Sequence, residues 1–303
     1  MGSRRNVETI PEVIKMAEII VPILTPFKGN KIDKEILKEH ASSLLKAGVD
    51  RIFVNGTTGM GPALSREEKE TTLRAVMEVT EKVIFQIGGL NMDDVKYLAK
   101  LAKDLSVKTV ASYAPYYFTG LPRWLIIKYF KEICEIHDEV YLYNYPSAVG
   151  KDVDAETVSE IGCIKGVKDT NDSINHSLQY KKIPNMKVFN GADTLVMTAI
   201  STGLDGTVSA AANFVPDVLV NIRERVLKAD IGSAMRLQFM VDELVSTAKG
   251  FGYIPSIYVL TKELMGYDVG EPRPVLFPLN ESQSMELLNK TREIFEKYSW
   301  SKK

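Results

Sequence analysis

The 303-residue chain contains little cysteine and little histidine. Its two cysteines, Cys134 and Cys163, lie far apart and form no CxxC motif, so we expect no disulfide framework and a reducing, cytoplasmic environment. The three histidines, His40, His137 and His176, fall in stretches of predicted helix away from the strand ends, and no HxxxH or HExxH spacing occurs. Because His-ligated metal enzymes use such spacings, metal catalysis of this type is not expected.

Long hydrophobic runs and an excess of one charge are also missing. The longest apolar runs fall far short of the ~20 residues that span a bilayer, so no membrane helix is expected. Thirty-eight basic residues stand against 39 acidic ones, and a net charge of -1 offers no positive excess for nucleic acid. Neither the GxSxG motif of serine hydrolases nor the P-loop motif is present, which leaves those enzyme classes without a candidate.

What the chain does contain is a repeated alternation of short β-branched or aromatic runs with amphipathic stretches of helical spacing. Eight such pairs follow one another without a break in composition. This pattern predicts an α/β fold in which a parallel sheet closes into a (β/α)8 TIM barrel, with a doubly wound open sheet as the alternative. The expected strands lie near Ile19 to Leu24, Arg51 to Val54, Val83 to Ile87, Val107 to Ser112, Glu139 to Asn144, Ile164 to Lys168, Lys187 to Asn190 and Gly203 to Val208.

Helix boundaries are signalled in several places. Asp33 and Asn91 are expected N-caps, and Ser65 opens a capping box with Glu68. After about Leu227 the strand signals stop and three helical stretches remain, at 231–249, 254–265 and 281–298. The sequence therefore predicts a catalytic barrel over residues 18–228 and a C-terminal helical region over 229–303, while residues 1–17 carry no recognisable role.

Polar residues follow nearly every expected strand, and active sites of TIM barrels lie at these strand ends. In the strand IKGVK, a period of two places Gly166 and Lys168 on one face. If this face lines the barrel, Lys168 is a desolvated lysine, which loses its proton easily and can form a Schiff base with a ketone. The alternative is a solvated lysine at a strand end, and the residues alone leave the two interpretations close to even.

Two neighbouring features could support such a lysine. Tyr143 ends the adjacent expected strand, where its phenol could transfer protons, although a packing tyrosine is the simpler interpretation. Tyr141 has the same parity and lies deeper, so we expect it to pack in the core. The segment GTTGMG (56–61, with Asn55 before it) offers backbone NH groups and two hydroxyls that suit a carboxylate or phosphate, but its spacing also fits a plain tight turn.

Five motifs together resemble a known family. GTTGMGPALSREEK, APYYF, YLYNYP, GVKDT and STGLDG occur in an order and spacing similar to the dihydrodipicolinate synthase and N-acetylneuraminate lyase superfamily of Schiff-base aldolases. Within it the chain most resembles the archaeal 2-keto-3-deoxygluconate aldolases, from about Ile19 to Leu279. The resemblance implies a class I aldolase that cleaves 2-keto-3-deoxygluconate to pyruvate and glyceraldehyde in an Entner-Doudoroff-type pathway, without a metal or an organic cofactor.

The resemblance also implies roles for individual residues. Lys168 matches the imine-forming lysine, and Tyr143, linked to Thr58 and Tyr117, matches the tyrosine that transfers protons. Thr57 and Thr58 match residues that hold the substrate carboxylate and relay protons. Tyr117 matches a tyrosine that reaches across a dimer interface, which implies a homotetramer built as a pair of dimers. Further positions that match residues around the sugar chain or the carboxylate are Tyr145, Thr170, Gly191, Asp193 and Ala210.

Departures from the family pattern bear on the substrate. Dihydrodipicolinate synthases typically carry an arginine where this chain has Ala148 and a glutamate where it has Met60, so a lysine-pathway synthase is the weaker alternative. Neuraminate lyase activity and a non-catalytic barrel that senses a keto acid remain as others. Relatives that cleave the phosphorylated sugar acid place arginines where this chain has Gly120 and Lys249, so we expect the unphosphorylated substrate to be preferred unless Arg123 takes over.

Overall fold

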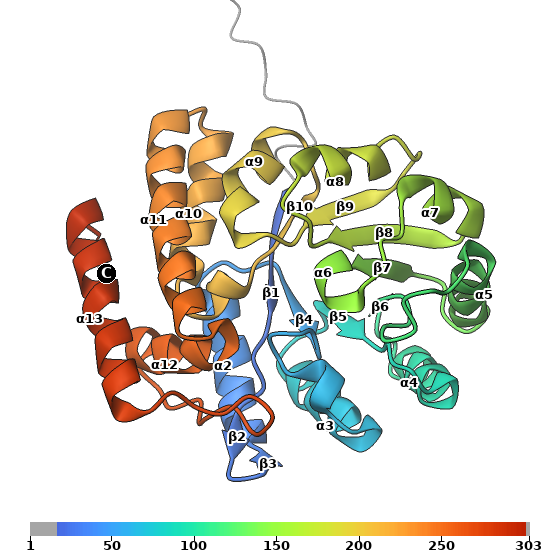
Figure 1. Ribbon diagram of the computed structural model, residues 1–303, viewed down its shortest axis with the longest axis horizontal. Coiled ribbons are helices and arrows are strands. Elements are labelled where there is room, and N and C mark those ends of the chain that lie inside the picture. The colour runs from blue at the N-terminus through green and yellow to red at the C-terminus, as the bar shows by residue number, and fades with distance from the viewer. Residues whose placement is uncertain (1–16, 301–303) are drawn as a thin grey trace, which may run out of the picture.

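The computed structural model describes residues 17–300, and expectations for residues 1–16 lie outside the described residues. Its parallel strands close into a barrel in the order β1-β10-β9-β8-β7-β6-β5-β4, as Figure 1 shows from one side. This arrangement confirms the (β/α)8 barrel and excludes the open sheet. The barrel strands are β1 (Glu18–Pro22), β4 (Arg51–Val54), β5 (Val83–Gln86), β6 (Thr109–Ser112), β7 (Val140–Asn144), β8 (Ile164–Asp169), β9 (Lys187–Asn190) and β10 (Gly206–Val208).

The helices begin where the sequence places N-caps. The Asp33 side chain accepts from the backbone NH of Ile36, and Ser65 and Glu68 form a complete capping box. None of the helices in residues 17–300 combines the length and hydrophobicity needed to cross a bilayer. The helices around the barrel are α2 (Lys34–Lys46), α3 (Arg66–Met77), α4 (Met92–Asp104), α5 (Arg123–Cys134), α6 (Pro146–Val149), α7 (Ala155–Ile161), α8 (Ile174–Tyr180), α9 (Val196–Ser201) and α10 (Pro216–Leu227).

Two local features differ from the sequence-based expectation. A short hairpin, β2 (Phe27–Lys28) with β3 (Lys31–Ile32), lies between β1 and α2 and was not predicted, because two-residue strands are too short to show a period. The last barrel strand starts at Gly206 instead of Gly203. The chain before it is the closing turn of α9, in which the NH of Gly203 donates to the carbonyl of Ile200.

The strand register places large side chains inside the barrel at matched heights. Tyr141 pairs with Gly166, and Tyr143 pairs with Lys168, on β7 and β8. A Cβ on Gly166 would lie 2.7 Å from the ring of Tyr141, so the small residue makes room for that ring. Tyr141 also stacks on Phe189, with ring centroids 6.2 Å apart. These contacts confirm that the face with Gly166 and Lys168 lines the barrel and that Tyr141 packs in the core.

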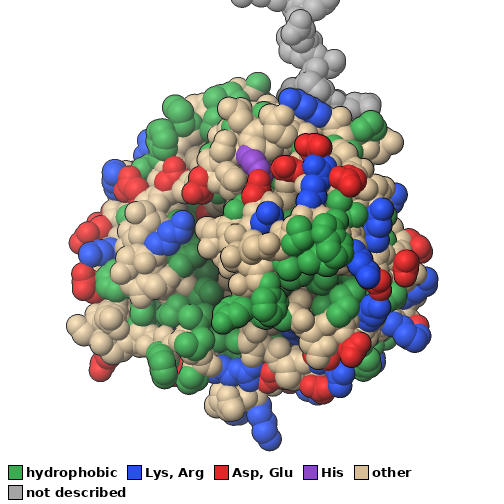
Figure 2. Space-filling view, turned by 45° about the vertical axis from the view of Figure 1, so that its right-hand side comes forward, with side chains coloured by type: hydrophobic (Ala, Val, Ile, Leu, Met, Phe, Trp, Pro, Cys, Tyr) green, Lys and Arg blue, Asp and Glu red, His purple; other side chains and the backbone are tan. Residues whose placement is uncertain are grey.

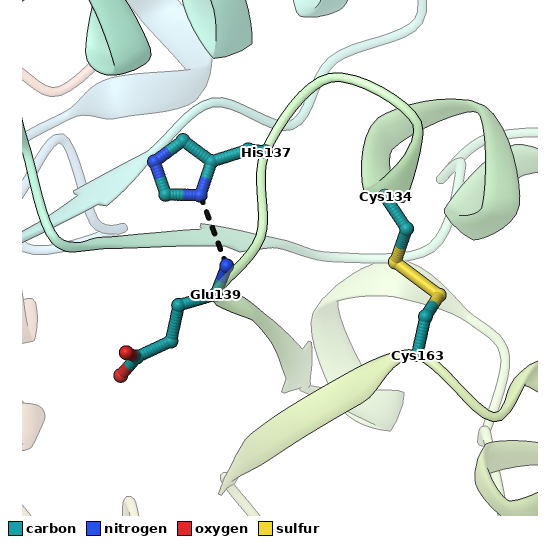
Figure 3. The surroundings of a disulfide bond; sticks show 4 residues. All are labelled: Cys134, His137, Glu139 and Cys163. Atoms are coloured by element: carbon teal, nitrogen blue, oxygen red, sulfur yellow. Dashed lines mark hydrogen bonds between the residues drawn. A yellow bond between two sulfur atoms is a disulfide. The ribbon is translucent and has the colours of Figure 1, made fainter.

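The two cysteines form a disulfide, which corrects the expectation from the sequence. Cys134 ends α5 and Cys163 directly precedes β8, and their Cα atoms lie 6.3 Å apart (Figure 3). Their separation of 29 residues gave no sign of this, because the contact arises from the packing of α5 against α7. The expectation of a reducing environment rested on the absence of a disulfide, so it is no longer supported.

Two histidines are also placed differently from the prediction. His137 lies in the turn between α5 and β7, where its Nε2 donates to the carbonyl of Val107. Its Nδ1 accepts from the NH of Glu139 (Figure 3). His176 is helical as predicted, but it is not remote from the strand ends. Its Nδ1 lies 2.9 Å from a carboxylate oxygen of Asp169, the last residue of β8.

The C-terminal helices α11 (Ile231–Gly250), α12 (Tyr253–Met265) and α13 (Glu281–Tyr298) pack beside α10 on one side of the barrel (Figure 1). The predicted boundary at residue 229 falls in the turn between α10 and α11, and the division into two units stays a prediction. Gln238 of α11 donates to the backbone carbonyl of Asp193, which follows β9. The helical region therefore contacts the strand ends of the barrel directly.

Candidate active site

A pocket of about 330 Å³ opens at the carboxyl ends of the barrel strands. It brings together nine of the ten predicted site residues, which come from the ends of five different strands. Tyr117 is the exception. The pocket is lined by Pro22, Thr57, Thr58, Tyr143, Tyr145, Ser147, Lys168, Thr170, Asp172, Gly191, Ala192, Asp193, Thr194, Val208, Ala210, Lys249, Tyr253 and Ile254.

Lys168 lies at the inner end of this pocket and is buried, with 5% of its surface exposed. Its Nζ lies 3.8 Å from the ring centroid of Tyr143 and 4.7 Å from that of Phe53. Burial lowers the pKa of Lys168 to about 7, and the negative charge of Asp193 opposes this shift only in part. A substantial fraction of the amine is therefore unprotonated near neutral pH, as a nucleophile for a carbonyl carbon requires.

Gly191 makes the space that the lysine occupies. A Cβ at this position would lie 3.2 Å from Cε of Lys168 and would collide with the hydroxyl of Thr170. The glycine follows β9, whose Phe189 pairs with Lys168 in the sheet register. Because residue 191 is a glycine, the side chain of Lys168 can extend to the inner end of the pocket without a clash.

Tyr143 hydrogen-bonds to a threonine, but not to the one that the sequence suggested. Its hydroxyl lies 3.0 Å from Oγ1 of Thr57, whereas the expected link was to Thr58. Successive residues of the turn point their side chains in different directions, which motif matching cannot resolve. Burial raises the pKa of Tyr143 to about 12, and the hydroxyl groups of Thr57 and Thr170 oppose the shift. The phenol is therefore protonated at neutral pH.

The GTTG segment between β4 and the short helix η1 (Gly61–Ala63) is a tight turn, as its glycines indicate. The NH of Met60 donates to the carbonyl of Thr57 at 3.0 Å. A Cβ on Gly59 would lie 2.6 Å from the carbonyl oxygen of Ile23, so the turn packs directly against the chain after β1. This packing holds Thr57 and Thr58 at the pocket wall.

Asp193 supplies a buried carboxylate to the pocket. It begins the short helix η2 (Asp193–Leu195) after β9 and is buried. Its carboxylate accepts hydrogen bonds from Ser209, from the NH of Ala211 and from the hydroxyl of Tyr253. Tyr253 comes from α12, and neither its type nor its position in the sequence identified it as a site residue.

The outer face of β8 is anchored separately. Asp169 points away from the pocket and accepts hydrogen bonds from Asn144, His176 and Ser177. Its partner His176 also lies 3.1 Å from a carboxylate oxygen of Asp152. Because the neighbouring backbone is fixed on its outer side, Lys168 has a rigid base on the inner side.

Tyr117 does not reach the pocket within this chain. It is 80% exposed and adopts a left-handed backbone conformation with φ 66°. Phe118 and Trp124 are exposed near it in sequence. Figure 2 shows hydrophobic side chains gathered on the side of the barrel that carries α5 and α7. The chain thus presents an apolar surface around Tyr117.

A larger cleft lies away from the strand ends, between the β2–β3 hairpin and the chain that follows α12. Its volume is about 1250 Å³. Three basic residues line its wall: Lys28 is exposed, while Lys262 and Arg273 are paired with Asp268 and Glu68, respectively. Within residues 17–300, no three His, Cys, Asp or Glu side chains converge in a way that could hold a metal ion. The smaller pocket is the candidate active site because it holds the buried Lys168 and nine of the ten predicted site residues.

Comparison with known proteins gives matches over nearly the whole chain. A profile of the Dihydrodipicolinate synthetase family matches residues 15–294. The chain is 50% identical over 297 residues to the 2-dehydro-3-deoxy-phosphogluconate/2-dehydro-3-deoxy-6-phosphogalactonate aldolase of Saccharolobus solfataricus, covering 97% of this chain and 96% of the relative. It is 43% identical to the 2-dehydro-3-deoxy-D-gluconate/2-dehydro-3-deoxy-phosphogluconate aldolase of Thermoproteus tenax, covering 92% of each.

The fold is similar to a solved structure over the same extent. The 2-keto-3-deoxygluconate aldolase of Sulfolobus solfataricus, in complex with D-KDPG, matches with a TM-score of 0.91. The match covers 93% of this chain and 97% of the solved chain at 51% sequence identity. Sequence and fold similarity therefore point to the same group of proteins.

Proposed function

The chain belongs to the dihydrodipicolinate synthetase family, and from this we propose that it is a class I aldolase that cleaves 2-keto-3-deoxygluconate to pyruvate and glyceraldehyde. The observation that carries the proposal is the buried amine of Lys168, whose pKa burial lowers to about 7, beside the protonated phenol of Tyr143. The names of its relatives as sugar-acid aldolases support it. Such cleavage belongs to Entner-Doudoroff-type sugar-acid breakdown.

The reaction starts at the ketone. The free amine of Lys168 attacks the C2 carbonyl, and loss of water gives a protonated imine. Tyr143, hydrogen-bonded to Thr57, takes the proton of the C4 hydroxyl after passing its own proton on to the departing water. The C3–C4 bond then breaks, its electron pair moves to C3 to form an enamine, and glyceraldehyde leaves. Protonation of C3 and hydrolysis of the imine release pyruvate and return the free amine.

The remaining pocket residues are proposed to bind the substrate. Thr57 and Thr58 would hold the carboxylate through the turn in which they lie. The rest of the wall would surround the sugar chain. These residues are Tyr145, Thr170, Gly191, Asp193 and Ala210. We take the unphosphorylated acid as the preferred substrate, although the names of the relatives include phosphorylated ones.

Assembly is a further part of the proposal. The exposed Tyr117 would enter the active site of a second copy, in a homotetramer built as a pair of dimers. Its left-handed backbone and apolar neighbours support a contact surface at this place. We also propose that the protein acts in the cytoplasm. The disulfide does not exclude that location, because disulfides also occur in some intracellular proteins.

Borohydride reduction in the presence of pyruvate tests the proposal. Reduction should leave a pyruvate adduct on Lys168, which peptide mass mapping locates. An adduct on another lysine, or none, would overturn the Schiff-base mechanism. Because a keto-acid sensor with a reactive lysine would also be trapped, pyruvate release from 2-keto-3-deoxygluconate must be measured separately. Trapping without release would favour the sensor.

Release that is confined to N-acetylneuraminate, or condensation of pyruvate with aspartate semialdehyde, would favour the other activities of the superfamily. Ala148, where the synthases carry an arginine, is exposed in α6 and offers no charge for a second carboxylate. We therefore expect neither activity to approach that on 2-keto-3-deoxygluconate.

A further inference from the structure

The carboxylate of Asp193 is held by three donors from two parts of the chain. Oδ1 accepts from Oγ of Ser209 at 2.6 Å and from the NH of Ala211 at 3.1 Å. Oδ2 accepts from the hydroxyl of Tyr253 at 2.6 Å. Because an ionised carboxylate offers about four lone-pair positions, one on Oδ2 stays available. Asp193 and Tyr253 both line the pocket, so this acceptor is at the wall that a bound molecule contacts.

The hydroxyl group of Tyr253 donates its only hydrogen to the carboxylate of Asp193. A phenol carries one donor and can also accept, so the hydroxyl of Tyr253 can offer the pocket only an acceptor while it donates to Asp193. Burial raises the pKa of Tyr253 well above its usual value, and the charge of Asp193 acts in the same direction. The phenol therefore keeps its proton, and the donor direction toward Asp193 is fixed.

The other charged groups near the pair, which include Lys168, Lys249, Asp172 and Asp242, do not reverse this character. Nζ of Lys249 lies 5.7 Å from the ring centroid of Tyr253, over its face, and Asp172 adds a further carboxylate to the pocket wall. Among the described residues that line the pocket, Lys168 and Lys249 are the basic ones. The Tyr253–Asp193 pair thus presents acceptors without a donor, which suits a hydroxyl group and repels an anion.

We propose that Tyr253 is a positioning residue that sets the specificity of the site: it holds Asp193 so that the pair accepts hydrogen bonds from the hydroxyls of the substrate beyond C4. The inference rests on the proposed function, since it assumes that the imine end of the substrate is at Lys168. It adds a residue from α12 that the family motifs do not include. It also predicts that the site prefers a substrate whose end beyond C4 carries neutral hydroxyl groups.

The variant Tyr253→Phe tests this because it keeps the ring and removes the hydroxyl. Loss of a hydrogen bond to a charged group should lower kcat/KM for 2-keto-3-deoxygluconate roughly 10-fold or more, with most of the change in KM. The truncated substrate 4-hydroxy-2-oxopentanoate has no hydroxyl beyond C4 and yields pyruvate and acetaldehyde. Its kcat/KM should change by less than about two-fold, because a contact that it cannot make costs it nothing.

Pyruvate trapping on Lys168 provides a second readout. Pyruvate lacks the far end altogether, so the rate of borohydride trapping in Tyr253→Phe should equal that of the unmodified protein. Tyr267→Phe is the matched control, since it removes a tyrosine hydrogen bond of similar length, 2.7 Å, to His40 outside the pocket. It should leave both substrates unaffected.

Asp193→Asn provides a check that does not depend on Tyr253→Phe folding well. The two changes should be non-additive on 2-keto-3-deoxygluconate, because they disrupt one acceptor pair. Equal losses on the long and truncated substrates, or slower pyruvate trapping, would show that Tyr253 only supports the fold. Unchanged kinetics of Tyr253→Phe in an otherwise active enzyme would overturn this inference alone. Absence of any turnover or adduct in the unmodified protein would instead refute the proposed function on which it rests.

Discussion

Nζ of Lys168 lies 3.8 Å from the ring centroid of Tyr143, and the sheet register pairs these two residues across β7 and β8. A cation over an aromatic face is stabilised. Burial nevertheless outweighs this contact and lowers the pKa of the lysine to about 7. The proposed nucleophile and the proposed acid/base therefore lie on adjacent strands, where neither needs to move to meet the same substrate.

The pH dependence of imine formation follows from the pKa of Lys168. Only the free amine attacks a ketone, so the rate of pyruvate trapping should rise through pH 7 and level off above about pH 8. The amount of pyruvate adduct formed in a fixed time of borohydride reduction, measured at a series of pH values, would give this curve. A midpoint above pH 9 would mean that the amine is as basic as an exposed lysine and that burial does not tune it.

The lowered pKa of Lys168 should also make the stability of the protein depend on pH. The pKa of Lys168 is about 7 in the folded protein and near 10.5 when exposed, so between these values the unfolded chain binds more protons. The free energy of unfolding should therefore rise with pH across this window. Lys168→Met should stabilise the protein by a few kcal/mol at pH 7, and the gain should shrink toward pH 10. Thermal melts of both proteins at pH 7 and pH 10 test this, and a gain independent of pH would contradict it.

Tyr143→Phe should lower kcat roughly 10²- to 10⁴-fold, because it removes the proposed proton-transfer group and keeps the ring beside Lys168. Steady-state cleavage of 2-keto-3-deoxygluconate measures the effect, and circular dichroism checks the fold. Tyr141→Phe is the matched control on the same strand and face, since Tyr141 packs below the pocket against Phe189. Full activity in Tyr143→Phe would return this tyrosine to a packing role.

We expect discrimination against the phosphorylated substrate because this chain has Gly120 and Lys249 where the resemblance places arginines. Arg123 does not compensate, because its guanidinium pairs with Glu156 at 2.9 Å and with Glu160 at 2.8 Å. Each missing charged hydrogen bond to phosphate is worth about 1.5–3 kcal/mol. We therefore expect kcat/KM to favour 2-keto-3-deoxygluconate over its 6-phosphate, and Arg123→Ala to leave the ratio unchanged. Equal efficiency on the phosphate, or a loss confined to it in Arg123→Ala, would argue against this account.

The disulfide should stabilise the barrel without taking part in catalysis. It closes a loop of 29 residues that contains β7 and Tyr143, and such a loop is worth about 3–4 kcal/mol in the chain-entropy account. Cys134→Ala combined with Cys163→Ala should therefore lower Tm, while kcat/KM well below the transition stays unchanged. Melting of the unmodified protein with and without a reductant gives an independent measurement. An unchanged Tm in both experiments would show that the bond contributes nothing.

Much of this protein is determined by local sequence. The alternation of extended and helical periods predicts the barrel, because each element must bury one face. Caps such as Asp33 and Ser65 define helix starts through contacts with residues three positions away. The period of two in β8 also places Lys168 inside the barrel once Gly166 is taken as an inward residue. These features depend on residues that are close together in the chain, so they can be predicted from the sequence alone.

Other features were decided only by tertiary structure. The choice of Thr57 over Thr58 as the partner of Tyr143 depends on how a turn packs against the chain after β1, and the disulfide depends on how α5 packs against α7. Tyr253 reaches Asp193 from 60 residues further along the chain. Such contacts join segments that share no period and no motif. Their partners are set by the three-dimensional closure of the barrel and the docking of α12, which periodicity and composition do not describe.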